Sequence, residues 1–147
     1  SACEKGLQWQ RALLILQRMR ERGSHPTLVT YNAAISACEK GQQVDCALQL
    51  LGKMEDGQLN PDVITFSAII STYEKSHQWE MALQVFDDMQ RRGVSPNVFS
   101  YGAVISACEK GQRWDVALNL LRQMRQHGVE ANDIAYSAAI SACEAAA

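Results

Sequence analysis

The chain has 147 residues, of which 47% are hydrophobic and 20% charged, a composition typical of a folded domain. Its formal net charge of -2 argues against binding of nucleic acid by bulk positive charge, because neutralising phosphates requires clustered Lys and Arg. The longest apolar run, Ala12 to Leu16, is far shorter than the roughly 18 to 20 residues of a membrane span, so none is predicted.

From the N-terminus onward, a short segment returns with a period of 35 residues. Ser1–Gly6 recurs at Ser36–Gly41 and Ser106–Gly111, with related segments at Ser71–Ser76 and Ser141–Glu144. Independent columns keep the same period, as in Met19, Met54, Met89 and Met124. The sequence therefore predicts three whole units and two partial ones: 28–62, 63–97 and 98–132, flanked by 1–27 and by 133–147, which holds a first helix only.

Each unit is expected to form two amphipathic helices. Tyr31, Ala34, Ile35 and Cys38 share one helical face, and Gly41 ends that helix. A second apolar stripe follows after a connection so short that the helices must be antiparallel neighbours. The expected helices lie near residues 8–22, 29–40, 43–55, 64–75, 78–92, 99–110, 113–127 and 134–144. Such hairpins must stack to bury their apolar faces, which predicts an all-α, right-handed solenoid.

The unit resembles the pentatricopeptide repeat. The resemblance covers the whole chain and rests on the 35-residue period, Val29–Asn32, Ala47–Leu48, Met54 and Asn60–Asp62. The tetratricopeptide repeat is the rival, but it has 34 residues and carries its Trp in the first helix, whereas the Trp column here opens the second. The resemblance implies binding of single-stranded RNA, one base per repeat, without catalysis or cofactor.

Bulky apolar residues occur once per unit on the face of the first helix opposite the core stripe. This column comprises Val29, Ile64, Phe99 and Ile134. Apolar side chains between bases would leave the base edges free for polar neighbours, as in RNA-binding helical repeats. The alternative is that these residues pack against the preceding hairpin.

By the same resemblance, bases are chosen by the Asn32 column together with the last residue of each unit. Asn32 with Asp62 implies uracil and Ser67 with Asn97 implies adenine. Gly102 with Asn132 departs from the common pairings, and adenine there completes a suggested U-A-A target. Ser137 and Thr27 each lack a partner in this chain. Residues of these types near a helix start also serve as turns and caps, which is the competing explanation.

Lysines near the end of each first helix form a basic column of Lys5, Lys40, Lys75 and Lys110. They could contact phosphates. They would equally well face the negative end of the helix dipole, next to the glutamates that precede them.

Other reactive residue types are expected to be structural. The cysteines have no CxxC spacing and are read as reduced thiols, and His25, His77 and His127 fall near turns without a metal-ligand motif. No metal site and no small-molecule substrate are predicted.

Two functions stay open. The first is sequence-selective RNA binding in organellar RNA processing, stability or translation. The second is a structural module that binds protein subunits within a large organellar assembly such as a ribosome or membrane complex, which the acidic balance favours. The resemblance places the protein in a mitochondrion or chloroplast. Because Ser1 begins inside a repeat and Ala145–Ala147 breaks it, we expect a fragment of a longer array.

Overall fold

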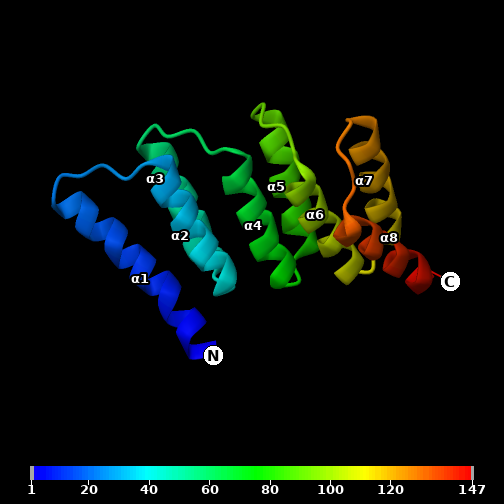
Figure 1. Cartoon of the computed structure of the whole chain (residues 1–147), viewed down its shortest axis with the longest axis horizontal. Coiled ribbons are helices and arrows are strands. Elements are labelled where there is room, and N and C mark those ends of the chain that lie inside the picture. The colour runs from blue at the N-terminus through cyan, green and yellow to red at the C-terminus, as the bar shows by residue number, and fades with distance from the viewer. Residues whose placement is uncertain (1, 147) are drawn as a thin grey trace.

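The computed structural model describes the backbone of residues 2–146 and the side chains of residues 8–133, 135–141, 143 and 144. Within that range the chain forms eight helices and no strand (Figure 1). In chain order these are α1 (Ala2–Glu21), α2 (Leu28–Lys40), α3 (Val44–Asp56), α4 (Val63–Lys75), α5 (Trp79–Arg91), α6 (Val98–Lys110), α7 (Trp114–Gln126) and α8 (Asp133–Ala146).

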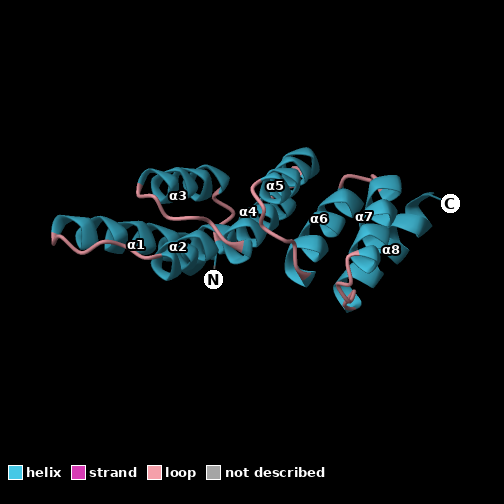
Figure 2. Cartoon of the chain, turned by 90° about the horizontal axis from the view of Figure 1, so that it is seen from above, coloured by secondary structure: helices cyan, strands magenta, loops and turns pink. Residues whose placement is uncertain are grey.

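The helices stack as successive hairpins. The first helices α2, α4, α6 and α8 pack one upon the next, and each second helix contacts its own first helix and that of the following unit. Seen from above, α3 and α5 lie to one side of the row that contains α2 and α4 (Figure 2). This arrangement confirms the predicted all-α solenoid.

The turn inside each hairpin has the same backbone form in every whole unit. One residue takes a left-handed conformation: Gln42 at φ 55°, His77 at φ 59° and Gln112 at φ 59°. In the first of these turns, the Gln43 N–H then donates to the Cys38 carbonyl at 2.8 Å. This bond uses a carbonyl that the end of α2 would otherwise leave unpaired.

The core follows the predicted stripe. Tyr31, Ala34, Ile35 and Cys38 are all buried, as the helical spacing predicted. Contacts between neighbouring units continue the core, as shown by the edge-to-face packing of Phe86 on Tyr101 at a centroid distance of 5.1 Å.

One expected boundary is wrong. A helix was expected near residues 8–22, but α1 runs unbroken from Ala2 to Glu21. The left-handed residue of the turn is Gln or His in the whole units, whereas the same place in the repeat is occupied by Leu7 here. A bulky apolar side chain is disfavoured in that conformation, so the backbone continues as helix. The helix α1 lies against α2 at one end of the stack (Figure 1).

Candidate nucleic-acid interface

A groove runs along the exposed side of the first helices, across three units. It has a volume of about 540 Å³. Its lining includes seven of the predicted site residues, which come from α2, α4 and α6 and from the positions just before α6 and α8: Asn32, Ile64, Ser67, Asn97, Phe99, Gly102 and Asn132. The solenoid therefore brings together residues that lie up to 100 positions apart in the sequence.

The apolar column projects into solvent rather than into the core. The exposed fractions are 78% for Val29, 59% for Ile64 and 70% for Phe99. The side chain of Ile134 lies outside the described residues. This exposure argues against the alternative that these side chains pack on the preceding hairpin.

Asn32 and Asp62 lie in direct contact, although they stand 30 positions apart, one on α2 and the other just before α4. The Asn32 amide nitrogen donates to Asp62 Oδ1 at 3.1 Å, and the Thr65 hydroxyl donates to Asn32 Oδ1 at 2.5 Å. The Thr65 backbone N–H also donates to Asp62 Oδ1, at 3.0 Å. The hydrogen bonds from Asn32 and Thr65 thus all reach Oδ1, so Oδ2 keeps the capacity to accept from a ligand.

This network also fixes the charge of the Asp62 carboxyl group. Burial alone would raise its pKa, but the hydrogen bonds from Thr65 and Asn32 outweigh burial and hold the pKa below its ordinary value. Asp62 is therefore ionised at neutral pH. The pair can therefore offer a ligand the second amide N–H of Asn32 as a donor and Oδ2 of Asp62 as an acceptor.

The next pair is Ser67 and Asn97. The Ser67 hydroxyl is buried and has no hydrogen-bond partner among the described residues. Asn97 Oδ1 accepts from the backbone N–H groups of Phe99 and Ser100, both at 3.0 Å, so its amide nitrogen is the group that stays available. A buried hydroxyl without a partner is costly, and a ligand that bonded to it would remove the cost.

The third pair is Gly102 and Asn132, in which the glycine contributes no side chain. A Cβ built on Gly102 meets no atom within 4 Å, so the groove is open at this position. Asn132 Oδ1 accepts from the Ala135 backbone N–H at 3.0 Å. The two unpaired members lie at the ends: Thr27 caps α2 through a hydrogen bond from Thr30, and Ser137 is exposed on α8.

Sequence reasoning treated base contact and helix capping as competing roles for the last residue of each unit, whereas the structure shows that capping is common to all of them. Thr27, Asp62, Asn97 and Asn132 each precede a first helix and accept a backbone N–H of its first turn. Thr65 was missed altogether. The spacing Asp62–Thr65, repeated as Asn97–Ser100, is a capping-box pattern that could have revealed it.

The lysine column lies along one edge of the first helices. Lys75 pairs with Glu39 at 2.8 Å and Lys110 pairs with Glu74 at 2.5 Å, in each case with the glutamate of the preceding unit. Lys40 is exposed, and the side chain of Lys5 lies outside the described residues. The lysines are thus anchored by carboxylates from the neighbouring helix rather than by the dipole alone.

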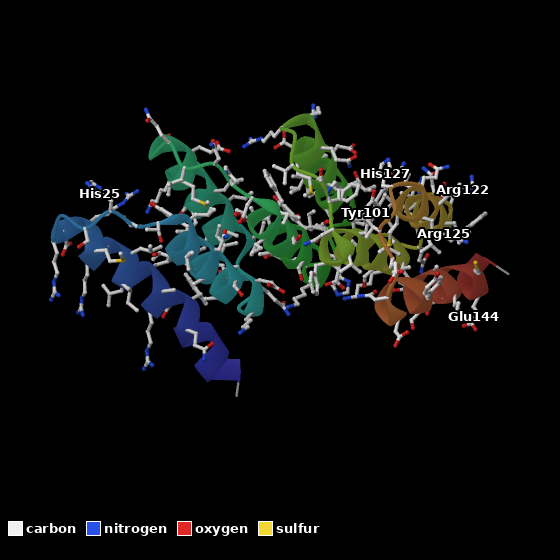
Figure 3. The ribbon with its side chains drawn as sticks, turned by 45° about the horizontal axis from the view of Figure 1, so that its top comes forward. His25, Tyr101, Arg122, Arg125, His127 and Glu144 are labelled. Atoms are coloured by element: carbon white, nitrogen blue, oxygen red, sulfur yellow. The ribbon has the colours of Figure 1, made fainter. Side chains whose placement is uncertain are left out.

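Other reactive residues lie away from the groove. Cys38 and Cys108 are buried, and burial raises the pKa of Cys38 to about 12 and that of Cys108 to about 11, so both thiols stay protonated. His127 Nδ1 lies 2.9 Å from the Tyr101 hydroxyl, while His25 is exposed at the far end (Figure 3). Across the described residues, no three His, Cys, Asp or Glu side chains gather as a metal site requires. None of the described helices combines the length and hydropathy of a membrane-spanning segment.

Family models match nearly the whole chain. The model of the PPR repeat family matches residues 26–75, 61–110 and 96–144, and that of the pentatricopeptide repeat domain matches residues 2–41. The chain belongs to the pentatricopeptide repeat family. Among curated protein sequences no match is found.

Solved pentatricopeptide repeat structures resemble the solenoid closely. The pentatricopeptide repeat protein PPR10 from maize is 27% identical, over 92% of this chain and 19% of that one, with a TM-score of 0.76. PPR10 in complex with an 18-nt psaJ RNA element is 29% identical, over 94% of this chain and 20% of that one, with a TM-score of 0.82. The chain thus spans about a fifth of PPR10.

A more distant relative shares the fold. The PPR domain of Arabidopsis thaliana protein-only RNase P 1, in complex with tRNA, is 19% identical, over 96% of this chain and 74% of that one, with a TM-score of 0.80.

Proposed function

We propose that the groove binds single-stranded RNA, with one base facing each unit. The observation that carries the proposal is the Asn32–Asp62 pair. It offers the second amide N–H of Asn32 and Oδ2 of Asp62 to a ligand, and the exposed Val29 and Ile64 lie close in sequence to Asn32 and Asp62 respectively. A base held between two apolar side chains would turn its polar edge toward this pair.

The donor and acceptor of the first pair match uracil. Uracil carries a carbonyl oxygen beside a ring N–H, so the Asn32 amide can donate to the carbonyl while Asp62 Oδ2 accepts from the ring. The unit 28–62 is thereby assigned to uracil.

The second and third pairs are assigned to adenine. Ser67 is short enough to leave room for a purine, and its free hydroxyl and the Asn97 amide can donate to purine nitrogens. Gly102 offers only space beside Asn132, so the third unit should discriminate least. The three whole units then favour the order U-A-A.

RNA complexes of the relatives support this proposal. PPR10 was solved with an RNA element, and the chain is similar to that structure over nearly its full length. By the family resemblance, we infer a role in organellar RNA processing, stability or translation, in a mitochondrion or chloroplast. The proposed function is binding, and the expectation that the chain has no catalytic activity stays a prediction.

The decisive experiment changes one side chain and one base. Fluorescence anisotropy would compare four short RNAs that differ only at the nucleotide facing unit 28–62, with the chain and with Asn32→Thr. We expect a preference for uracil in the first case and a shift toward guanine in the second, because the shorter Thr leaves room for a purine while Asp62 still accepts from guanine N–H donors. One polar contact contributes about 0.5 to 1.5 kcal/mol, so the preference should be several-fold.

The second candidate is a protein-binding scaffold. The net charge of -2 and the exposed apolar column would also suit a peptide with apolar side chains. A chain that ignores the facing base both before and after Asn32→Thr would favour this function, which co-purification with subunits of a large assembly would then test.

A further inference from the structure

Two carboxylates of the groove are each shared between a lysine and a serine of the next unit. Glu39 Oε1 accepts from Ser71 Oγ at 2.8 Å and from Lys75 Nζ at 2.8 Å. Glu74 Oε1 accepts from Ser106 Oγ at 3.1 Å and pairs with Lys110 Nζ at 2.5 Å. The same cluster therefore occurs at two successive junctions between units.

These clusters face the groove in which we place RNA. Glu39, Ser71, Glu74 and Ser106 all line it. The carboxylates are largely enclosed, with side-chain exposures of 21% for Glu39 and 12% for Glu74, whereas each paired lysine is 36% exposed. An ion pair in this partly buried setting is screened less by salt than one on an open surface.

The ion pairs reduce the positive charge available to a phosphate. An ammonium group within hydrogen-bond distance of a carboxylate has its charge nearly cancelled at longer range, and the carboxylate itself repels a phosphate. A phosphate approaching Lys75 or Lys110 must therefore share the ammonium group with a glutamate that already holds it.

We propose that Glu39 and Glu74 act as a brake on phosphate binding: each neutralises the lysine of the following unit and so limits the affinity and the salt dependence of RNA binding. This inference rests on the RNA-binding function proposed above. With the lysines restrained, the base-facing pairs contribute a larger share of the binding energy, and the groove becomes more selective than one lined by free lysines.

The chain contains its own matched control. Glu109 belongs to the same column, but the residue one period after Lys110 is Ala145 rather than Lys. Glu74→Gln and Glu109→Gln each remove one negative charge from equivalent positions. Only Glu74→Gln releases a lysine, and its amide oxygen can still accept from Ser106.

The test measures RNA affinity as a function of salt. Wild type, Glu74→Gln, Glu109→Gln and the double variant Glu74→Gln/Lys110→Gln would be titrated with a U-A-A RNA and with a base-substituted RNA. For Glu74→Gln we expect affinity about tenfold higher at low salt and a log–log salt slope steeper by about 0.7, the value for one single-strand phosphate contact. Glu109→Gln should keep the wild-type slope, and Lys110→Gln should cancel the gain.

The outcomes separate the brake from the function on which it rests. An unchanged slope or weaker binding by Glu74→Gln, with base preference intact, would make the cluster purely structural and overturn the brake. A steeper slope without a base preference would support the neutralisation of Lys110 by Glu74 and would contradict base recognition by the groove. Absence of RNA binding by every variant would reject both. Urea unfolding would check that Glu74→Gln is folded, and Glu39→Gln, which releases Lys75, supplies a second variant that decides the question if it is not.

Discussion

The indole ring of Trp79 lies so close to Gly111 of the next unit that a Cβ atom on this glycine would stand 2.2 Å from the ring carbon Cδ1. Trp9 and Gly41 repeat the relationship, with the corresponding distance at 2.6 Å. Gly111 has φ -83° and Gly41 has φ -86°, values that any residue adopts. The contact therefore requires the absence of a side chain rather than an unusual backbone.

Gly111→Ala should destabilise the solenoid by about 1 to 3 kcal/mol, because the added methyl group would displace the Trp79 ring in a packed interface. Gly102→Ala is the matched control, since a Cβ there meets nothing within 4 Å and alanine is a better helix former by about 1 kcal/mol. Urea unfolding should show opposite signs for the two variants. Equal effects would mean that the ring moves aside freely.

Val44 and Ser76 occupy the same two columns as Trp79 and Gly111, one period earlier. Val44 is smaller than Trp79 and Ser76 is larger than Gly111, so a smaller side chain on the helix occurs together with a larger one in the facing turn. Val44→Trp alone should destabilise by overpacking, and Ser76→Gly in the same chain should relieve it. A double-mutant cycle should give a coupling of at least about 1 kcal/mol. A coupling near zero would show that the two positions do not meet.

Ser67→Ala should separate stability from RNA recognition. It removes a buried hydroxyl that has no partner, which should stabilise the fold by about 1 kcal/mol. If the hydroxyl contacts a base, the same change should reduce the preference of unit 63–97 for adenine several-fold. Thermal unfolding and anisotropy measure the two effects. A loss of stability would indicate that the hydroxyl bonds within the fold.

Asp62 should contribute a pH-dependent part of the stability. Its folded pKa lies below the ordinary value of 3.8, so its contribution is fully present above about pH 4 and is lost as pH falls through the lower folded pKa. Asp62→Asn keeps a capping oxygen but cannot titrate. The difference in the free energy of unfolding between wild type and this variant should therefore shrink below about pH 4. A difference that does not change with pH would contradict this role of Asp62.

Much of the fold follows from the sequence because the repeat presents the same pattern several times. The spacing of Tyr31, Ala34 and Ile35 identifies the buried face, and the short turn after Gly41 makes the helices antiparallel. The long helix α1 was not predicted. Its course depends on one residue, Leu7, in a position where the other units tolerate a left-handed backbone.

The site was harder to predict because its contacts cross between units. The sequence places Glu39 next to Lys40, but adjacent residues on a helix point about 100° apart and do not meet. The structure pairs Glu39 with Lys75, one period plus one residue away. Similarly, the resemblance pairs Asn32 with Asp62, but nothing near Asn32 in the sequence indicates that Thr65 of the next unit joins them, because stacking of α4 on α2 creates that contact.

The capping role of the last residue in each unit restricts how the array can acquire new targets. Asp62, Asn97 and Asn132 cap a helix start with the same side chain that we propose faces the base, so an exchange there must keep a short side chain with an acceptor oxygen. Positions 32, 67 and 102 carry Asn, Ser and Gly and cap no helix. Both natural divergence and repeat engineering should therefore redirect such a protein mainly through this second set of positions, where substitution leaves the helix caps intact.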